Sequence, residues 1–291
     1  MKKIFAFIAV SLFLVFSGCD KVLIPQQPRA ATSVGDTVRR IFIEDFTGHY
    51  CPNCPLAAEM LDSVKNAFPG QVIGMGVHIQ TFAWPCPPHG SVVGQLPNTF
   101  TEDFRIAEES EYNSIFGTDN FPLPTGFVNR YQALVTPTAI TGWPPVAATE
   151  LAKPITAYIK IIPTYNSATR ALSVTVTGKF MEDTTGTFRI ALFLTEDSLT
   201  GAQTDNRLPS PGIDNNYVFN HVCRGSINSP GSILGEQLST GFVPDNTLIN
   251  YTMSNSFTVN AAYDATHCKI IAILFQSSDY GVLQAAECEL E

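Results

Sequence analysis

The sequence is short of charge, and of positive charge most of all. Charged residues make up only 15% of the 291 residues, with 17 Lys and Arg against 26 Asp and Glu, which gives a net charge of −9. No basic stretch with interleaved aromatic residues occurs, so the usual nucleic-acid-binding surfaces are excluded. The low charge and the many Thr, Ser, Asn, Gly and Pro residues are typical of an exported, β-rich protein.

The sequence also lacks an apolar run long enough to cross a membrane. The apolar run at 4–16 follows a basic pair and is itself too short to span, so residues 1–18 are predicted to be a signal peptide. The run leads to Ser17-Gly18-Cys19, which is similar to a bacterial lipobox. We therefore expect Cys19 to carry lipid and to anchor the protein in a membrane. The alternative is an ordinary signal peptide with an incidental cysteine.

The rest of the chain predicts a tether and two domains. Residues 19–36 are rich in Pro, Gln, Ala and Ser, which is typical of a linker. Residues 37–152 alternate strand and helix patterns, and residues 153–291 read as strand after strand, which predicts a β-sandwich. The expected strands and helices of the first domain lie at 40–46, 55–67, 71–79, 101–116, 121–129, 131–135 and 145–151. The expected strands of the second lie at 155–163, 171–180, 187–195, 217–223, 251–259, 269–276 and 282–290.

The most informative motif is Cys51-Pro52-Asn53-Cys54, at the junction of a predicted strand and a predicted helix. The N-terminal end of a helix stabilises a thiolate on the first cysteine, and the second lies one turn further on, close enough to form a disulfide. Asp45 precedes the first cysteine by six residues, where its carboxyl group is expected under the helix near Cys54. This arrangement predicts redox chemistry.

These residues resemble the thioredoxin superfamily. Tyr50 fills the place of the aromatic residue before its Cys-x-x-Cys motif, and Leu123-Pro124-Thr125 fits its cis-proline, which faces the cysteines. The resemblance implies an α/β thioredoxin-like domain over residues 37–152, with an extended substrate pairing beside Pro124. It also places Tyr50 and Thr125 among the substrate-binding residues.

The chemistry of such a site assigns a role to each residue. Cys51 is the expected nucleophile, more exposed than Cys54 and with a depressed pKa, because only a thiolate attacks a disulfide. Cys54 would resolve the mixed disulfide, and a buried Asp45 with a raised pKa would accept its proton. Pro52 and Asn53 are expected to contact substrate, but they do not distinguish reduction from oxidation.

The mature chain as a whole is similar to the twenty-eight-kilodalton outer-membrane-protein (Omp) family of Bacteroidota. The resemblance implies an outer-membrane lipoprotein in which an all-β sandwich follows the thioredoxin-like domain, and it implies no defined activity. Because Asp20 and Lys21 form no acidic cluster after Cys19, the sequence does not assign the periplasmic or the cell-surface face. The shared segments are 44–48, 51–55, 124–130, 194–197 and 220–224.

Three functions are open for the Cys-x-x-Cys motif. The leading hypothesis is thiol–disulfide exchange with exported proteins, fed by a membrane redox donor and needing no cofactor. The alternative is a non-enzymatic binding or adhesion lipoprotein in which the motif is a structural disulfide. Copper or zinc binding, with His49, His78 or His89 as partners of the two cysteines, is the third, and we assign no metal.

Four further cysteines and two charged residues carry weaker expectations. Cys268 and Cys288 flank a predicted hairpin that turns near Asp279, so a cross-strand disulfide and two facing thiols are both open. Cys86 and Cys223 are candidates for a pair across the domains. Glu44 is expected to face away from Asp45 as a surface or second-layer charge. His221, beside Arg224, is either part of a ligand patch or a satisfied group at the core edge.

Overall fold

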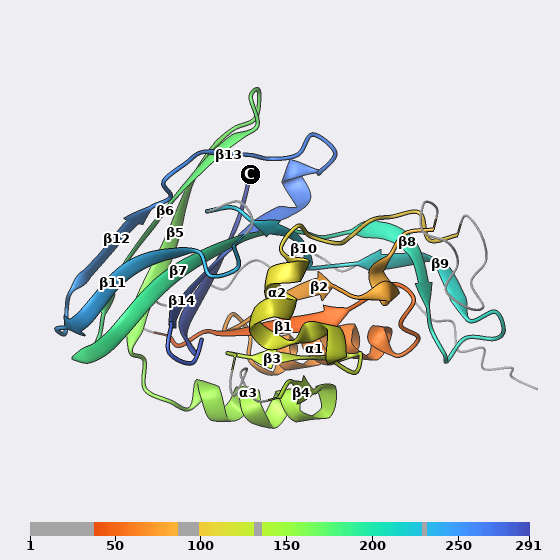
Figure 1. The fold of residues 1–291 in the computed structure, drawn as a ribbon, viewed down its shortest axis with the longest axis horizontal. Coiled ribbons are helices and arrows are strands. Elements are labelled where there is room, and N and C mark those ends of the chain that lie inside the picture. Colours follow the sequence, from red (N-terminus) through yellow and green to blue (C-terminus); the bar gives the residue numbers. More distant parts are fainter. Residues whose placement is uncertain (1–37, 87–98, 131–135, 229–231) are drawn as a thin grey trace, which may run out of the picture. The chain divides into compact units, whose positions relative to one another are not determined.

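The computed structural model describes residues 38–86, 99–130, 136–228 and 232–291, which lie within one compact unit, Thr32–Glu291 (Figure 1). The expected signal peptide and tether, with Cys19, lie outside the described residues, as do His89 and the strand expected at 131–135. The described chain is mostly β-sheet, with few helices.

The first half of the chain begins with a parallel pair of strands joined by a helix. β1 runs parallel to β2, β3 runs antiparallel to β1, and β4 runs antiparallel to β3. Helix α1 starts where Pro55 supplies a preset φ angle in its first turn, and it ends before Pro69 and Gly70. The elements are β1 (Ile41–Thr47), α1 (Cys54–Ala67), β2 (Val72–His78), η1 (Thr81–Ala83), α2 (Glu109–Phe116), η2 (Thr118–Asn120), β3 (Thr125–Val128), β4 (Thr138–Ala139), η3 (Ile140–Gly142) and α3 (Trp143–Leu151).

Where the structure describes the second half, its elements are strands and one short 3₁₀ helix. Its elements are β5 (Ala157–Asn166), β6 (Ala171–Phe180), β7 (Thr184–Glu196), β8 (Leu199–Thr204), β9 (Ile213–Phe219), β10 (Val222–Ser226), β11 (Glu236–Val243), β12 (Leu248–Thr252), β13 (Phe257–Thr258), η4 (Ala265–His267), β14 (Cys268–Gln276) and β15 (Val282–Glu289).

One nine-stranded sheet receives strands from both halves. Its order is β15-β14-β7-β10-β2-β1-β3-β4, and β11 also pairs with β7. The junction lies between β10 and β2, where Val222 is paired with Gly76. The segments 37–152 and 153–291 therefore contribute neighbouring strands to a single sheet, a connection that the predicted two-domain division does not include.

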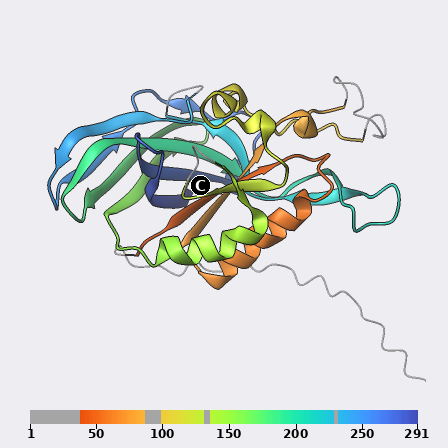
Figure 2. The same cartoon turned by 60° about the horizontal axis from the view of Figure 1, so that its bottom comes forward.

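The two faces of this sheet bury different cores. Along β7, Leu192 and Leu194 face the core that is shared with the four-stranded sheet of β5, β6, β12 and β13, so these two sheets form a sandwich. Ala191 and Phe193 face the opposite core, which α2 covers. Helices α1 and α3 cover β1 and β2 on the side away from α2 (Figure 2).

Two predicted elements differ from the observed ones for local reasons. The helix expected from Thr101 begins only at Glu109, because the Asp103 carboxylate accepts the backbone N–H of Arg105 and its guanidinium, and these bonds compete with a helix. The strand expected at 217–223 is interrupted at His221, whose φ of 59° is left-handed and ends the strand pattern.

Candidate functional site

The Cys-x-x-Cys motif lies in the turn that leads from β1 into α1. Cys51 and Cys54 form a disulfide, with their Cα atoms 5.4 Å apart, and Cys54 is the first residue of the helix. The Asn53 side chain does not cap the helix. Instead it contacts the side chain of Asn206, which is far away in the sequence.

Both sulfur-bearing residues are buried. Cys51 and Cys54 are each only 2% exposed, so the expectation that Cys51 would be the more exposed of the two is wrong. Pro52 and Asn53, between them, are exposed. What covers the disulfide is the hairpin of β8 and β9, which comes from the second half of the chain (Figure 1).

This hairpin binds the Cys-x-x-Cys turn through the turn's own carbonyl oxygens. The Gln203 side-chain amide donates to the Cys51 carbonyl oxygen at 3.0 Å. The Thr204 backbone N–H donates to the His49 carbonyl oxygen at 2.9 Å, and the Asn206 N–H donates to the Pro52 carbonyl oxygen at 3.0 Å. Three positions of the hairpin thus hold the turn.

An exposed ion pair adds to the contact between hairpin and helix. Arg207, beyond the end of β8, lies 2.8 Å from Glu59 on α1 and 2.7 Å from Asp205 in its own loop. The side chains of Arg207 and Glu59 are 42% and 61% exposed, so solvent screens their attraction. The backbone and Gln203 bonds therefore hold the hairpin more than this pair does.

Asp45 lies beneath α1, as its spacing from the motif predicts. The side chain is 4% exposed, and its Oδ1 atom has no hydrogen-bond partner among the residues that the structure describes. Burial raises the pKa of Asp45 to about 8, because the charged form loses its hydration. The carboxyl group is therefore mostly protonated at neutral pH.

A cavity of about 200 Å³ connects Asp45 and Cys54 with the hairpin. His78 also lines it, and neither ring nitrogen of His78 has a partner in the described parts of the chain. Burial lowers the pKa of His78 to about 3, which keeps the ring neutral. The inner cysteine thus faces a cavity in which Asp45 Oδ1 and both ring nitrogens of His78 lack a partner among the described residues.

The structure places the other predicted site residues as follows. The Leu123–Pro124 peptide bond is cis and precedes β3, in which Thr125 pairs with Phe46 of β1. The Thr125 hydroxyl donates to the carbonyl oxygen of Thr138 at 3.1 Å, so it is engaged within the sheet. These residues lie at the end of β1 from which the Cys-x-x-Cys turn departs.

Tyr50 is part of the protein core. It is 6% exposed and lies 4.3 Å, between ring centroids, from Phe100. It belongs to a small cluster with Cys86 and Ala202 of β8, and burial raises its pKa to about 12. Tyr50 therefore supports the turn and the hairpin, and its ring does not present a free surface to a substrate.

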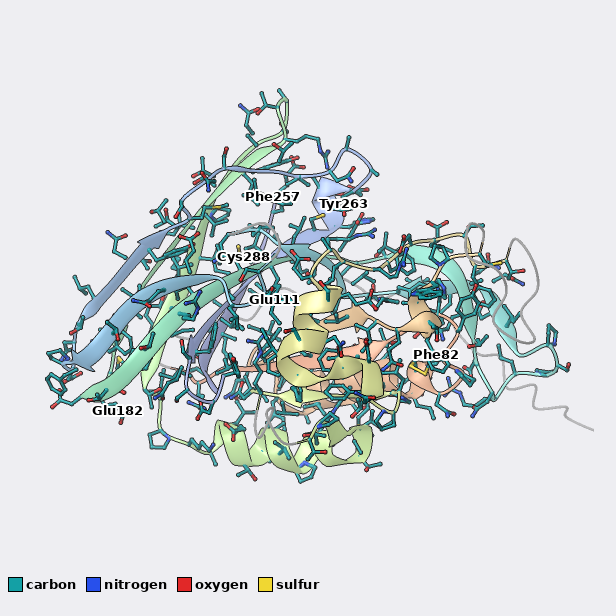
Figure 3. The ribbon with its side chains drawn as sticks, in the orientation of Figure 1. Phe82, Glu111, Glu182, Phe257, Tyr263 and Cys288 are labelled. Atoms are coloured by element: carbon teal, nitrogen blue, oxygen red, sulfur yellow. A yellow bond between two sulfur atoms is a disulfide. The ribbon has the colours of Figure 1, made fainter. Side chains whose placement is uncertain are left out.

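The four remaining described cysteines are thiols, which corrects the disulfide considered for Cys268 and Cys288. The Leu290 N–H bonds to the Cys268 carbonyl oxygen, and Cys288 is opposite Ile270, so the two cysteines are offset along the strands. Such diagonal positions lie farther apart than a disulfide allows. Cys288 packs against the core between the two sheets (Figure 3).

Cys86 and Cys223 do not pair either. Both are buried thiols, and they belong to different apolar clusters. Within the described residues, no group of three or more His, Cys, Asp or Glu side chains is placed to hold a metal ion. His49, one candidate ligand, instead contacts the carbonyl oxygen of Trp84 through Nε2 at 3.0 Å.

The sequence does not predict several residues of the site. The hairpin contacts of Gln203 join positions 152 residues apart, and no local pattern signals them. Glu44 is fully buried rather than near the surface, and it pairs with Arg130 through two bonds of 2.9 Å. The one sequence feature that points to this pair is that Arg130 ends the segment that follows Pro124.

Residues 109–290 match the family described as outer membrane protein Omp28. The chain belongs to this family. The matched segment contains both the hairpin that covers the disulfide and most of the sandwich. No curated protein matches the sequence.

Solved structures resemble this Omp28-family protein at low identity. HBP35 of Porphyromonas gingivalis is 12% identical, with a TM-score of 0.59, over 88% of this chain and 76% of that one. A protein from Agrobacterium tumefaciens is 11% identical, with a TM-score of 0.48, over 88% and 97%. A domain of the outer membrane lipoprotein Omp28 from Porphyromonas gingivalis is 19% identical, with a TM-score of 0.28, over 46% and 87%. Only the first likeness bears on the fold.

Family membership assigns this Omp28-family protein to the outer membrane, as the sequence predicts. In the parts of the chain that the structure describes, no helix is sufficiently long and apolar to span a bilayer.

Proposed function

We propose that residues 37–152 form a thioredoxin-like domain that exchanges thiols and disulfides with exported proteins. The strand order β2-β1-β3-β4 supports this proposal, because two parallel strands joined by α1 are followed by two antiparallel ones. So does the start of α1 at Cys54, which gives the motif the helix N-terminus that stabilises a thiolate.

The proposed anchor is lipid on Cys19, followed by the tether of residues 19–36. Two or three acyl chains on one cysteine hold a protein firmly to a bilayer. In this arrangement the redox domain works at the outer membrane, on exported polypeptides that come near it, and a membrane redox donor restores the motif after each turnover.

The observation that carries the redox proposal is the unpaired carboxyl group of Asp45. A buried polar group without a partner costs stability, and groups with shifted pKa values in a cavity concentrate at functional sites. Asp45 shares its cavity with Cys54 and holds a proton at neutral pH. It is therefore placed to exchange a proton with the inner sulfur.

The reaction follows from the oxidised state of the motif. A substrate thiolate attacks Cys51 Sγ, the S–S bond breaks, and Cys54 leaves with the electron pair and takes the proton of Asp45. A second substrate thiolate then attacks the mixed disulfide and releases Cys51 as a thiolate. The substrate gains a disulfide, the motif gains two electrons, and the reverse sequence reduces a substrate disulfide.

The β8–β9 hairpin sets a condition on this reaction. A protein thiol cannot approach Cys51 while the residue is 2% exposed and Gln203 binds its carbonyl oxygen. Exchange with a protein substrate therefore requires the hairpin to move away from the turn. Pro124 and Thr125 keep the substrate-binding role that the resemblance gives them.

A second candidate function rests on the same burial. If the hairpin never opens, Cys51–Cys54 is a structural disulfide, and the protein is a binding or adhesion lipoprotein. The observation behind this alternative is that Cys51 and Cys54 are each only 2% exposed.

The test is catalysis by the full-length protein in detergent, with a denatured test protein that carries scrambled disulfides. We expect the wild type to accelerate recovery of the native disulfides, Cys51→Ser to abolish that acceleration, and Asp45→Asn to reduce it by about a hundredfold, the scale of general acid–base catalysis. Equal recovery with the wild type and with Cys51→Ser would overturn the redox proposal in favour of the structural disulfide.

A further inference from the structure

A second group of reactive side chains lies outside the disulfide site. Lys65 of α1 lies with its Nζ atom 2.9 Å from Nε2 of His221, in the turn between β9 and β10. The Nδ1 atom of the same imidazole lies 3.1 Å from Oδ1 of Asp197, in the turn between β7 and β8. Three distant segments thus build a chain of carboxylate, imidazole and amine.

The contacts around the imidazole suit one tautomer for the chemistry. With the proton on Nδ1, Nε2 accepts an N–H from Lys65. The Nδ1 atom lies 3.1 Å from Asp197 Oδ1 without a hydrogen bond to it, and Asp197 Oδ1 accepts the backbone N–H of His221 at 2.6 Å. The other carboxylate oxygen pairs with Lys269 at 2.9 Å.

The imidazole is held in one orientation by its backbone. His221 has a φ of 59°, a left-handed conformation that costs energy in a residue other than glycine. Its N–H binds Asp197, and its carbonyl oxygen accepts the N–H of Gly76 of β2 at 2.7 Å. These bonds on both sides hold the ring against the amine of Lys65.

The surroundings of Lys65 combine burial with several charged neighbours. The side chain is half-buried, and loss of hydration lowers its pKa. Four charged groups face it: Asp62 of its own helix, Asp197, Lys269 of β14 and Glu287 of β15. The three carboxylates raise the pKa and Lys269 lowers it, and the effect of burial exceeds their sum.

A small molecule can reach the imidazole from a cavity. His221, Asn220 and Asp62 all line the cavity of about 200 Å³ that also reaches Cys54. Asn220 and Asp62 are exposed, so this end of the cavity opens to solvent.

We propose that Lys65 is an activated amine nucleophile, with His221 as its base and Asp197 as the positioning residue, and that the site takes a small aldehyde. A nucleophile in hydrogen-bond reach of a base, which a third group orients, is the arrangement of covalent catalysis. An aldehyde suits it, because imine formation needs a base first and an acid afterwards, and one imidazole serves as both. The proposal is independent of the redox role of the cysteines.

The covalent step balances without a further reactant. The unprotonated amine of Lys65 attacks the carbonyl carbon, a C–N bond forms, and one N–H proton passes through Nε2 of His221 to the alkoxide oxygen, which gives a carbinolamine. The remaining N–H proton passes by the same route to the hydroxyl group, which leaves as water, and an imine forms on Lys65. Added cyanoborohydride then supplies hydride and converts the imine to a stable secondary amine.

The test uses the full-length protein in detergent with propanal and cyanoborohydride at pH 7.5, and peptide mass spectrometry measures alkylation at each lysine. Lys160 is the internal control, since it is an exposed lysine of β5. We expect Lys65 to react at least about tenfold faster than Lys160, because a positioned general base contributes about a hundredfold or more to such a step. Equal rates at the two lysines would overturn the proposal.

Two variants separate activation from structure. His221→Asn removes the base while tolerating the left-handed backbone, and we expect it to slow Lys65 about tenfold and move its pH profile toward that of Lys160. Lys65→Arg keeps N–H donors at this position but offers no amine nucleophile, so it should remove the label without lowering the melting temperature. A Lys65 rate that is unchanged in His221→Asn, with circular dichroism confirming the fold, would contradict the role of the imidazole.

Discussion

Strand β1 carries two adjacent buried carboxyl groups, and the two faces of the sheet satisfy them very differently. Glu44 faces the core beneath α2, where Arg130 donates to both of its oxygens and the Tyr112 hydroxyl donates at 2.8 Å. Asp45 faces α1, and its Oδ1 atom has no partner in the described chain. Both residues are acidic and both are buried, so the difference lies in their hydrogen-bond partners.

The comparison separates a structural charge from a reactive one. The Glu44–Arg130 pair is fully buried and closes a contact between β1 and the segment after β3, with Phe116 and Phe275 packed on the guanidinium. Its bonds hold both groups in one arrangement. Asp45 lacks such bonds, so its proton remains available to Cys54 in the shared cavity.

The largest expected effect is that of Asp45→Asn on the pH dependence of the free energy of unfolding. A carboxyl group with a folded pKa of about 8 and an unfolded value of 3.8 binds a proton only in the folded state between those values. The free energy of unfolding must therefore fall as pH rises from 4 to 8, by on the order of 5 kcal/mol. Urea unfolding across this range should show a slope that Asp45→Asn removes. Identical slopes in both proteins would mean that Asp45 is not a buried neutral acid.

Arg130→Met tests the buried pair with Glu44, on the face of the sheet that α2 covers. Loss of one partner leaves Glu44 as a buried, unpaired charge, which should lower the free energy of unfolding by about 4 kcal/mol. Urea unfolding at pH 7 measures it, and the double variant with Glu44→Leu should recover most of the loss. A loss below about 1 kcal/mol, typical of exposed pairs, would break the distinction between the two carboxyl groups.

Gln203→Ala should loosen the hairpin over the disulfide. The lost hydrogen bond to the Cys51 carbonyl oxygen is expected to ease opening by about 1 kcal/mol, or about fivefold. The rate of Cys51–Cys54 reduction by dithiothreitol, followed by alkylation, measures this change. Gln284→Ala is the matched control, because Gln284 is a fully buried glutamine whose bonds to Val38 and Arg40 lie outside the hairpin. Equal acceleration by both variants would point to general destabilisation instead.

The smallest effect is expected for Arg207→Ala. Its pair with Glu59 is exposed and is worth at most about 1 kcal/mol, so the reduction rate should rise by less than about fivefold. Lys153→Ala removes an ion pair with Glu150 whose lysine is similarly exposed, at the end of α3, and should leave the rate unchanged. If the reduction rate rises as much in Arg207→Ala as in Gln203→Ala, the ion pair is the main contact that holds the hairpin.

The sequence predicts those parts of the fold that depend on local signals. The apolar run at β1, the helix start at Pro55 and the strand at 269–276 are found close to where they are expected. Strand β8 and the start of β9 escape prediction, because their mostly polar residues cover the Cys-x-x-Cys turn instead of filling a large core.

The candidate site divides in the same way. The position of Asp45 under α1 follows from its spacing to the motif, because alternate residues of a strand face the same side. The burial of Cys51 does not follow, because Gln203 and Asn206 reach it from more than 150 residues away. Partners that long-range pairing brings together leave no trace in a single sequence.

The reduction potential of the Cys51–Cys54 pair tests the central claim most directly. Glutathione titration of the full-length protein in detergent, with Cys51→Ser as control, measures it. The proposed exchange function predicts a potential near or above about −270 mV, within the range of exchange catalysts. A pair that stays oxidised well below about −300 mV would be a structural disulfide, and the binding-protein alternative would replace the redox account.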